Sequence, residues 1–206
     1  MQELVACAVS IDDVRDVFGA SPALADRLRA AAAARFSSQT PKRRQWMRPL
    51  MRRDPAFRVD PAAPSSRDVE ALLAGGFIAP DRVGPSWVVL IGWLEELSAA
   101  SRRTPWDEAA FERAEWNLAR AGLNSDYSLR SLGDRDLGIP LRPLPGQVAG
   151  YAKHVHAVET LRALRAAYDH PELTAEDRRI LTPILDVLET ASRQPRLDVV
   201  VVDATA

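Results

Sequence analysis

The sequence has 206 residues, of which 47% are hydrophobic and 27% charged, and its formal net charge is −1. This balance is typical of a folded globular protein and excludes wholesale disorder. A single cysteine, Cys7, excludes an internal disulfide, and we interpret it as a small buried hydrophobic residue. The longest apolar run, Trp87 to Leu94, is much shorter than the roughly 20 residues of a membrane-spanning helix. Since we also recognise no secretory signal, we expect a cytoplasmic protein without membrane contact.

The first half of the chain predicts one strand and four helices. Residues 2–9 are apolar on both faces, which is typical of a strand that is covered on both sides. Ser10 with Asp13 predicts a capping box for a short helix that Gly19 ends. The helix from Trp87 to about Ala100, capped by Ser86, is hydrophobic nearly all round, so we expect it at the centre of the core. The other two helices are predicted over residues 22–36 and 66–73, separated by an irregular Pro- and Arg-rich segment over residues 37–65.

The second half predicts three further helices and a closing strand. Thr104-Pro105 with Asp107 is expected to begin a helix that Gly122 ends, and residues 124–150 are expected to be irregular. Thr174 with Asp177 predicts a capping box for the last helix, which Pro183 either kinks or divides. The four consecutive valines within residues 197–204 predict a buried strand. Between residues 124–150 and the last helix, a helix over about 154–169 is expected to bury Val155, Val158, Leu161, Leu164 and Tyr168.

These elements together predict an α+β fold. We expect a predominantly helical single domain over residues 1–206, in which the N- and C-terminal strands pair in a small sheet. Both strands are apolar on both faces, so helices should cover the sheet on each side.

Motifs for phosphate-binding loops, dinucleotide binding, serine hydrolases, zinc proteases and redox dithiols do not occur in the sequence. His154 and His156 form the only close histidine pair, and at this spacing they share a face on a strand but not on a helix. We interpret them as surface or capping residues and predict no catalytic residue, metal ligand or cofactor. If the chain is an enzyme, its site is expected near residues 140–156, with Tyr151, His154 and His156 lining a pocket.

Positive charge is concentrated in one block of the chain. Between Arg27 and Arg58 ten Lys or Arg residues stand against one acid, Asp54, so this block carries +9 and the remaining residues carry −10. Such asymmetry indicates an anionic partner. If a helical turn begins at Thr40-Pro41, Arg44, Arg48 and Arg52 form one ridge beside an apolar stripe. The candidate partner-binding residues are Arg43, Arg44, Trp46, Arg48 and Arg52. In the alternative interpretation, the segment packs Trp46 onto the domain and its arginines neutralise the protein's own acids.

Three segments resemble the YfbM-like family of uncharacterised bacterial proteins. They are the opening strand that runs into Ser10-Ile11-Asp12-Asp13-Val14, the Gly150-Tyr151 turn that enters a helix, and the closing helix followed by Leu197-Asp198-Val199-Val200-Val201-Val202. The likeness covers the two ends of the chain, and the Arg-rich middle departs from it. It implies a compact α+β domain with paired terminal strands and assigns no activity and no functional residues.

The sequence leaves three functions open. We favour a non-catalytic intracellular binding protein, an immunity or adaptor-type partner of an acidic protein. The second function is a nucleic-acid-associated protein that uses the same Arg-rich segment. The third is an enzyme of unknown class with a site near residues 140–156. The oligomeric state is not predicted.

Overall fold

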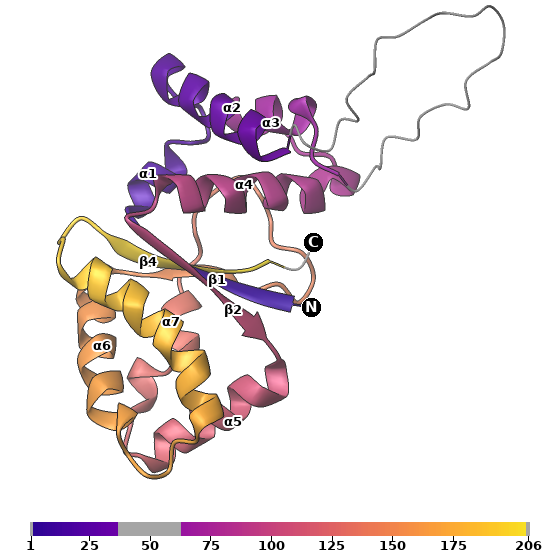
Figure 1. The fold of residues 1–206 in the computed structure, drawn as a ribbon. Helices are drawn as coiled ribbons and strands as arrows, with labels where there is room; N and C mark the ends of the chain where they lie inside the picture. Colours follow the sequence, from indigo (N-terminus) through magenta and orange to yellow (C-terminus); the bar gives the residue numbers. More distant parts are fainter. Residues whose placement is uncertain (1, 37–62, 205–206) are drawn as a thin grey trace, which may run out of the picture.

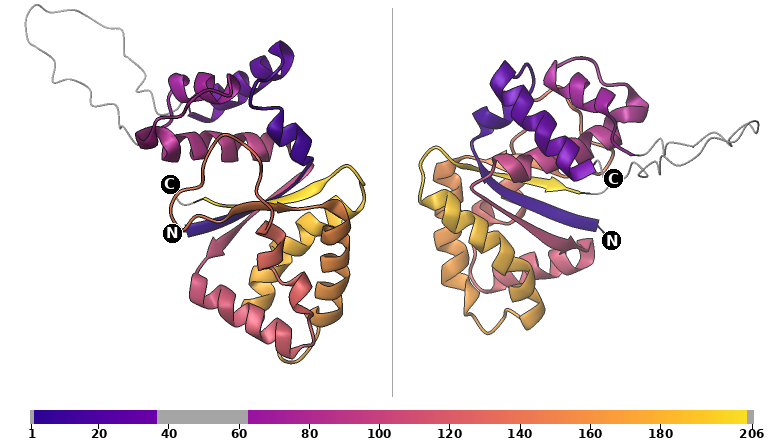
Figure 2. Two further views of the ribbon diagram at one scale, coloured as in Figure 1. Left: turned by 180° about the vertical axis from the view of Figure 1, so that it is seen from behind. Right: turned by 45° about the horizontal axis from the view of Figure 1, so that its top comes forward.

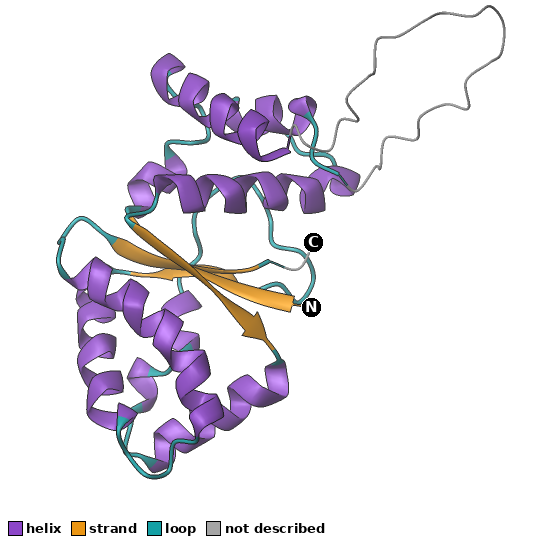
Figure 3. Ribbon diagram, in the orientation of Figure 1, coloured by secondary structure: helices purple, strands orange, loops and turns teal. Residues whose placement is uncertain are grey.

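The computed structural model describes residues 2–36 and 63–204 and confirms the α+β class. Among these residues four strands form one antiparallel sheet, and helices cover both of its faces (Figures 1 and 3). The strands are β1 (Gln2–Val9), β2 (Ala100–Trp106), β3 (Ala149–Ala152) and β4 (Asp198–Asp203), and their order in the sheet is β2-β1-β4-β3.

The helices are divided between the two faces, as the views in Figure 2 show. The upper layer consists of α1 (Ile11–Arg15), α2 (Pro22–Phe36), α3 (Ser66–Leu73) and α4 (Val83–Leu97). The lower layer consists of α5 (Glu108–Arg120), α6 (His154–Tyr168) and α7 (Ala175–Ser192). Short 3-10 turns are η2 (Pro80–Arg82), η3 (Ser125–Tyr127) and η4 (Arg130–Gly133).

The two central strands, β1 and β4, are apolar on both faces because each face meets its own core. Successive side chains of a strand point to opposite faces. The upper core contains Val5, Cys7 and Val9 of β1 together with Val200 and Val202 of β4. The lower core takes Leu4, Ala6 and Ala8 of β1 with Val199 and Val201 of β4. The continuous apolar runs in the sequence therefore report burial on both sides.

The predicted pairing of the terminal strands is confirmed. β1 and β4 are antiparallel neighbours, with a register that runs from Leu4 opposite Asp203 to Val9 opposite Asp198. The sheet is larger than expected, because β2 pairs with the outer side of β1 and β3 with the outer side of β4.

The predicted start of a helix at Thr104-Pro105 was wrong. Both residues belong to β2, and α5 begins at Glu108 with Asp107 as its N-cap. Pro105 is tolerated in this strand because β2 is an edge strand, where a missing N–H need not break a ladder. Part of the segment predicted to be irregular is likewise ordered, since β3 begins at Ala149 and η3 and η4 precede it. Gly150 and Tyr151 thus lie in a strand and not in a turn.

The outer edge of β3 is covered by residues 133–135. The backbone N–H of Tyr151 donates to the carbonyl of Arg135 at 2.9 Å. The chains approach so closely that a Cβ on Gly150 would lie 1.9 Å from the carbonyl oxygen of Gly133. Glycine is therefore required at position 150, which accounts for a glycine inside a strand.

Two helix starts differ from the prediction. α4 begins at Val83 and ends at Leu97, so Ser86 lies within the helix and does not cap it. Pro85 stands in the first turn, where its missing N–H costs no hydrogen bond, and the predicted start after Pro85 was therefore wrong. In α1, the Ser10 side chain accepts from the backbone N–H of Asp12 at 3.3 Å, in place of a capping box with Asp13.

The lower helices follow the predicted pattern with one exception. In α6 Leu161 and Leu164 are buried as predicted, and Val158 and Tyr168 are half-buried. Val155 is 67% exposed, because the stripe that faces α7 and β4 is completed by Ala157 and Ala167. α7 runs unbroken through Pro183. Its buried face offsets the cost of the internal proline. This face contains Leu181, Ile184, Leu188 and Ala191, as predicted.

Asp198, at the start of β4, joins the two layers. Its buried carboxylate accepts the backbone N–H of Ile11 at 3.2 Å and of His154 at 3.0 Å, which are the first residues of α1 and α6. Asp198→Ala should lower the free energy of unfolding by about 2–4 kcal/mol, because a buried and a half-buried N–H donor both lose a charged acceptor. Urea titration of the exposed control Asp13→Ala should give a change within about 0.5 kcal/mol. A loss below about 1 kcal/mol for Asp198→Ala would contradict this role.

The predicted capping box of α7 is confirmed. The Asp177 carboxylate accepts from the N–H and hydroxyl of Thr174 at 2.8 and 2.7 Å, and from the Asn117 amide at 2.9 Å. Burial by itself raises the pKa of Asp177, but these hydrogen bonds outweigh it and hold the pKa below its usual range.

This shift makes the contribution of Asp177 to stability depend on pH. The unfolded chain binds the proton at a higher pH than the folded chain does. The stability that Asp177 adds is therefore complete above the unfolded pKa of about 3.9 and is lost as the pH falls through the lower folded pKa. We expect Asp177→Asn to be less stable than the wild type at neutral pH, with a difference that shrinks on acidification. Unfolding free energies measured over a pH series test this, and a constant difference would refute it.

Candidate functional site

The predicted partner-binding residues lie outside the described residues. Arg43, Arg44, Trp46, Arg48 and Arg52 all belong to residues 37–62. Their ridge and their role as a contact surface therefore stay predictions.

Those Lys and Arg residues of the positive block that lie in the described part of the chain form ion pairs within the protein. Three of the ten lie on α2, and each pairs with an acid of α3 or α4. The pairs are Arg27–Glu96 at 3.2 Å, Arg29–Glu70 at 2.8 Å and Arg35–Glu95. Residues 37–62 contain the other seven cations against two acids, Asp54 and Asp60, and so carry +5, while the rest of the chain carries −6.

Tyr151, His154 and His156 do not line one pocket. Tyr151 is a buried strand residue of the upper core, with Arg15 and Lys153 at 5.7 and 5.4 Å from its ring centroid. His156 lies in the lower layer, where its ring is 5.8 Å from that of Tyr127. None of these three residues lines the cavities described below, and the enzyme site near residues 140–156 stays a prediction.

His156 forms a pair with Ser131 that resembles a nucleophile and its base. Its Nε2 lies 3.0 Å from Ser131 Oγ, but the same hydroxyl donates to the carbonyl of Ser128 at 2.6 Å. A serine hydroxyl has one proton, so Nε2 donates to Ser131 and does not accept from it. An activating base must accept the proton of its nucleophile. The pair therefore stabilises the turn at η4.

Two titratable groups with raised pKa values are structural. Burial raises the pKa of the Glu115 carboxyl, against hydrogen bonds from the backbone N–H groups of Arg130 and Leu129. Burial, with the nearby charge of Glu95, raises the pKa of the Cys7 thiol to about 12, so the thiol stays protonated and unreactive. Neither residue lines the cavities described next.

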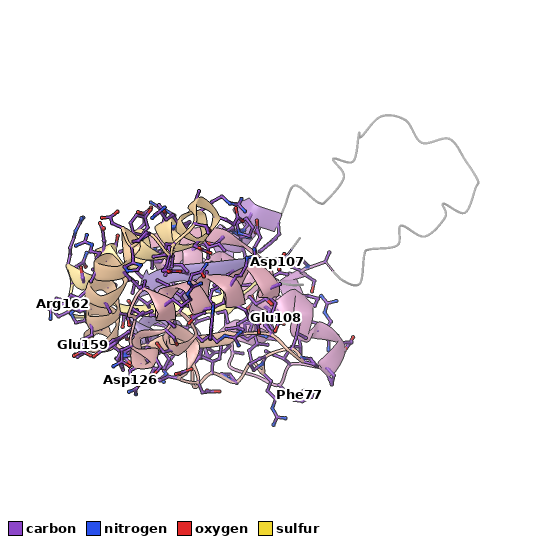
Figure 4. All side chains as sticks on the ribbon, turned by 90° about the horizontal axis from the view of Figure 1, so that it is seen from below. Phe77, Asp107, Glu108, Asp126, Glu159 and Arg162 are labelled. Carbon is purple, nitrogen blue, oxygen red and sulfur yellow. The ribbon has the colours of Figure 1, made fainter. Side chains whose placement is uncertain are left out.

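Two cavities meet at Phe77, in the loop between α3 and η2. Their volumes are about 570 and 560 Å³, and Phe77 and Ile78 line both. Phe77 itself is 86% exposed and lies at the edge of the molecule, far from Glu159 and Arg162 of α6 (Figure 4). We name the Phe77 surface by Arg67, Phe77, Ile78, Asp81 and Arg142, which lie around these cavities.

Hydrogen bonds hold the loop that carries Phe77. The N–H groups of Gly75 and Gly76 donate to the carbonyls of Leu72 and Ala71, each at 3.0 Å. Gly75 has φ +61°, a left-handed conformation that glycine adopts without strain. The ring is thus presented on a fixed turn at the end of α3.

An ion pair fixes one wall of the first cavity, and a hydrogen bond from a buried indole fixes one wall of the second. Arg82 Nε donates to Asp68 Oδ1 at 2.8 Å, and Asp68 also closes the capping box of α3 with Ser65. In the second cavity the indole N–H of buried Trp87 donates to the carbonyl of Arg142 at 2.9 Å. This site is not among those predicted from the sequence, where its local signal is the apolar Phe77-Ile78 pair after the Gly75-Gly76 turn.

A further cavity of about 490 Å³ lies at the lower edge of the sheet. Its polar lining residues are Glu108, Arg130, Asp134, Gln147 and Asp203. No group of three His, Cys, Asp or Glu within residues 2–36 and 63–204 is placed to hold a metal ion. In the same part of the chain, no helix has the length and apolar character needed to cross a membrane.

Comparison with family models, curated proteins and solved structures finds no match for this chain. The resemblance to the YfbM-like family therefore stays a prediction, and function must be argued from the residues.

Proposed function

We propose that this chain is an intracellular, non-catalytic binding protein that recognises an acidic protein, in the manner of an immunity or adaptor-type partner. The observation that carries this proposal is the separation of charge between residues 37–62, which carry +5, and the rest of the chain, which carries −6. The three arginines of α2 pair with the protein's own acids and therefore do not add to this excess.

The same segment combines charge with large apolar side chains. Trp46, Met47 and Met51 stand among the arginines. Electrostatic attraction speeds association and selects partners by sign, while aromatic and arginine residues supply most of the affinity at protein interfaces. A segment with both properties is suited to specific recognition of an acidic protein surface.

The triple variant Arg44→Glu/Arg48→Glu/Arg52→Glu reverses three charges of this segment and tests the proposal. Binding to poly-L-glutamate and to single-stranded DNA is measured over a series of salt concentrations, together with the melting temperature. We expect binding to poly-L-glutamate to fall at least about tenfold with an unchanged melting temperature. The matched control Arg135→Glu/Arg162→Glu/Arg196→Glu makes the same change in net charge at exposed sites elsewhere and should lose far less, because distant charges are screened.

The other outcomes are equally informative. A clear preference for DNA with a steep salt dependence would favour the nucleic-acid function. Unchanged binding with a lowered melting temperature would show that the arginines pair internally and would refute the binding role. Absence of binding to either polyanion would also refute it.

A further inference from the structure

The Phe77 surface has the shape of a site for a peptide. Its two cavities, of about 570 and 560 Å³, fall in the range of natural ligand pockets, and each is large enough for bulky side chains. Phe77 and Ile78 form the partition between them. A chain that crosses Phe77 can place one apolar side chain in each cavity while its backbone passes over the ring.

The exposure of Phe77 supports a contact role. Single exposed hydrophobic residues are common and need no explanation by themselves. Here, however, the ring is 86% exposed on a hydrogen-bonded turn and stands between two concavities. Aromatic residues in such settings are the usual anchors of protein interfaces.

The charges around the site indicate what binds there. Arg67 and Arg142 are exposed on opposite cavities, and neither forms an ion pair with another described residue. Arg82 is matched by Asp68, which leaves Asp81 as the acid that opposes the two arginines. The surface is thus positive on balance, although the body of the protein is negative. Carboxylates of a ligand are attracted to Arg67 and Arg142.

We infer that the Phe77 surface binds an extended peptide segment of an acidic protein. Bulky apolar side chains of the peptide enter the cavities on either side of Phe77, and its carboxylates face Arg67 and Arg142. This inference rests on the proposed function, since it describes a second contact with the same class of partner, but it uses none of residues 37–62.

The test is a selection from a displayed library of random peptides against the full-length protein. Selected peptides are synthesised with a fluorescent label, and their affinities are measured by fluorescence polarisation. We expect them to combine Asp or Glu with aromatic or leucine residues. Phe77→Ala and Arg67→Glu/Arg142→Glu should each weaken binding at least about tenfold. Trp116→Ala, a change at another exposed aromatic residue in the lower layer, should leave the affinity unchanged.

Each result has one meaning. Selected peptides that lack acidic residues, or that bind Phe77→Ala as tightly as the wild type, overturn the inference. Stronger competition by single-stranded DNA than by poly-L-glutamate also overturns it. If the peptides depend on Arg44, Arg48 and Arg52 but not on Phe77, the proposed function stands and the Phe77 surface is excluded. If the selection yields no binding peptide, the inference fails.

Discussion

A chain that ends at Arg196 is expected to be unfolded under conditions in which the full chain is folded. The missing residues include β4, which lies between β1 and β3 and pairs with both. Val199 to Val202 are buried on both faces of the sheet. Each buried valine contributes about 1.5–3 kcal/mol, so these four account for roughly 6–12 kcal/mol. This is comparable with the whole stability of a typical domain, about 5–15 kcal/mol.

Circular dichroism and thermal unfolding of the shortened chain check this expectation. A chain that ends at Ala204 retains all of β4 and is the matched control, with an expected melting temperature close to that of the full chain. A chain ending at Arg196 that kept its melting temperature would show that the sheet does not depend on β4.

Trp93→Ala is expected to lower the free energy of unfolding by about 3–5 kcal/mol. Trp93 lies in α4, is 1% exposed, and belongs to the upper core. Its indole N–H donates to the carbonyl of Leu28 at 2.8 Å, which ties α4 to α2. The substitution removes a large apolar volume and also the hydrogen bond between the two helices.

The control for Trp93 is again Trp116→Ala, since Trp116 is 67% exposed on α5. Its expected change is within about 0.5 kcal/mol. Denaturant titration of both variants gives the two values under the same conditions. A loss below about 1 kcal/mol for Trp93→Ala would place α4 at the surface.

The parts of the fold that the sequence predicts are those that leave a local signal. β1 and β4 are apolar runs, and α7 carries its capping box and apolar stripe within one stretch of chain. β2 and β3 leave no such signal. Arg102, Arg103 and Pro105 are tolerated in β2 only because it is an edge strand, and β3 is defined by its fit against residues 133–135. Such features depend on neighbours that are distant in sequence.

The candidate site illustrates the same limit. The charge block is visible in the sequence, yet the internal pairing of Arg27, Arg29 and Arg35 depends on how α2 packs against α3 and α4. The cavities beside Phe77 are built from α3, η2, α4 and the loop around Arg142, which no short sequence window contains. The sequence offers only a local apolar pair, Phe77-Ile78, of which Phe77 is exposed and Ile78 is partly buried.

The central place of β4 has a consequence for how the chain folds during synthesis. The ribosome delivers β1 first and β4 last, although the two are neighbours, with Leu4 opposite Asp203. Among the described strands, β2 is the one native partner of β1 available until β4 emerges, and the other edge of β1 stays open to unwanted pairing. Contacts between residues so far apart in sequence make folding slow, on the order of milliseconds to seconds. We therefore expect this edge of β1 to be open to wrong pairing until β4 is delivered.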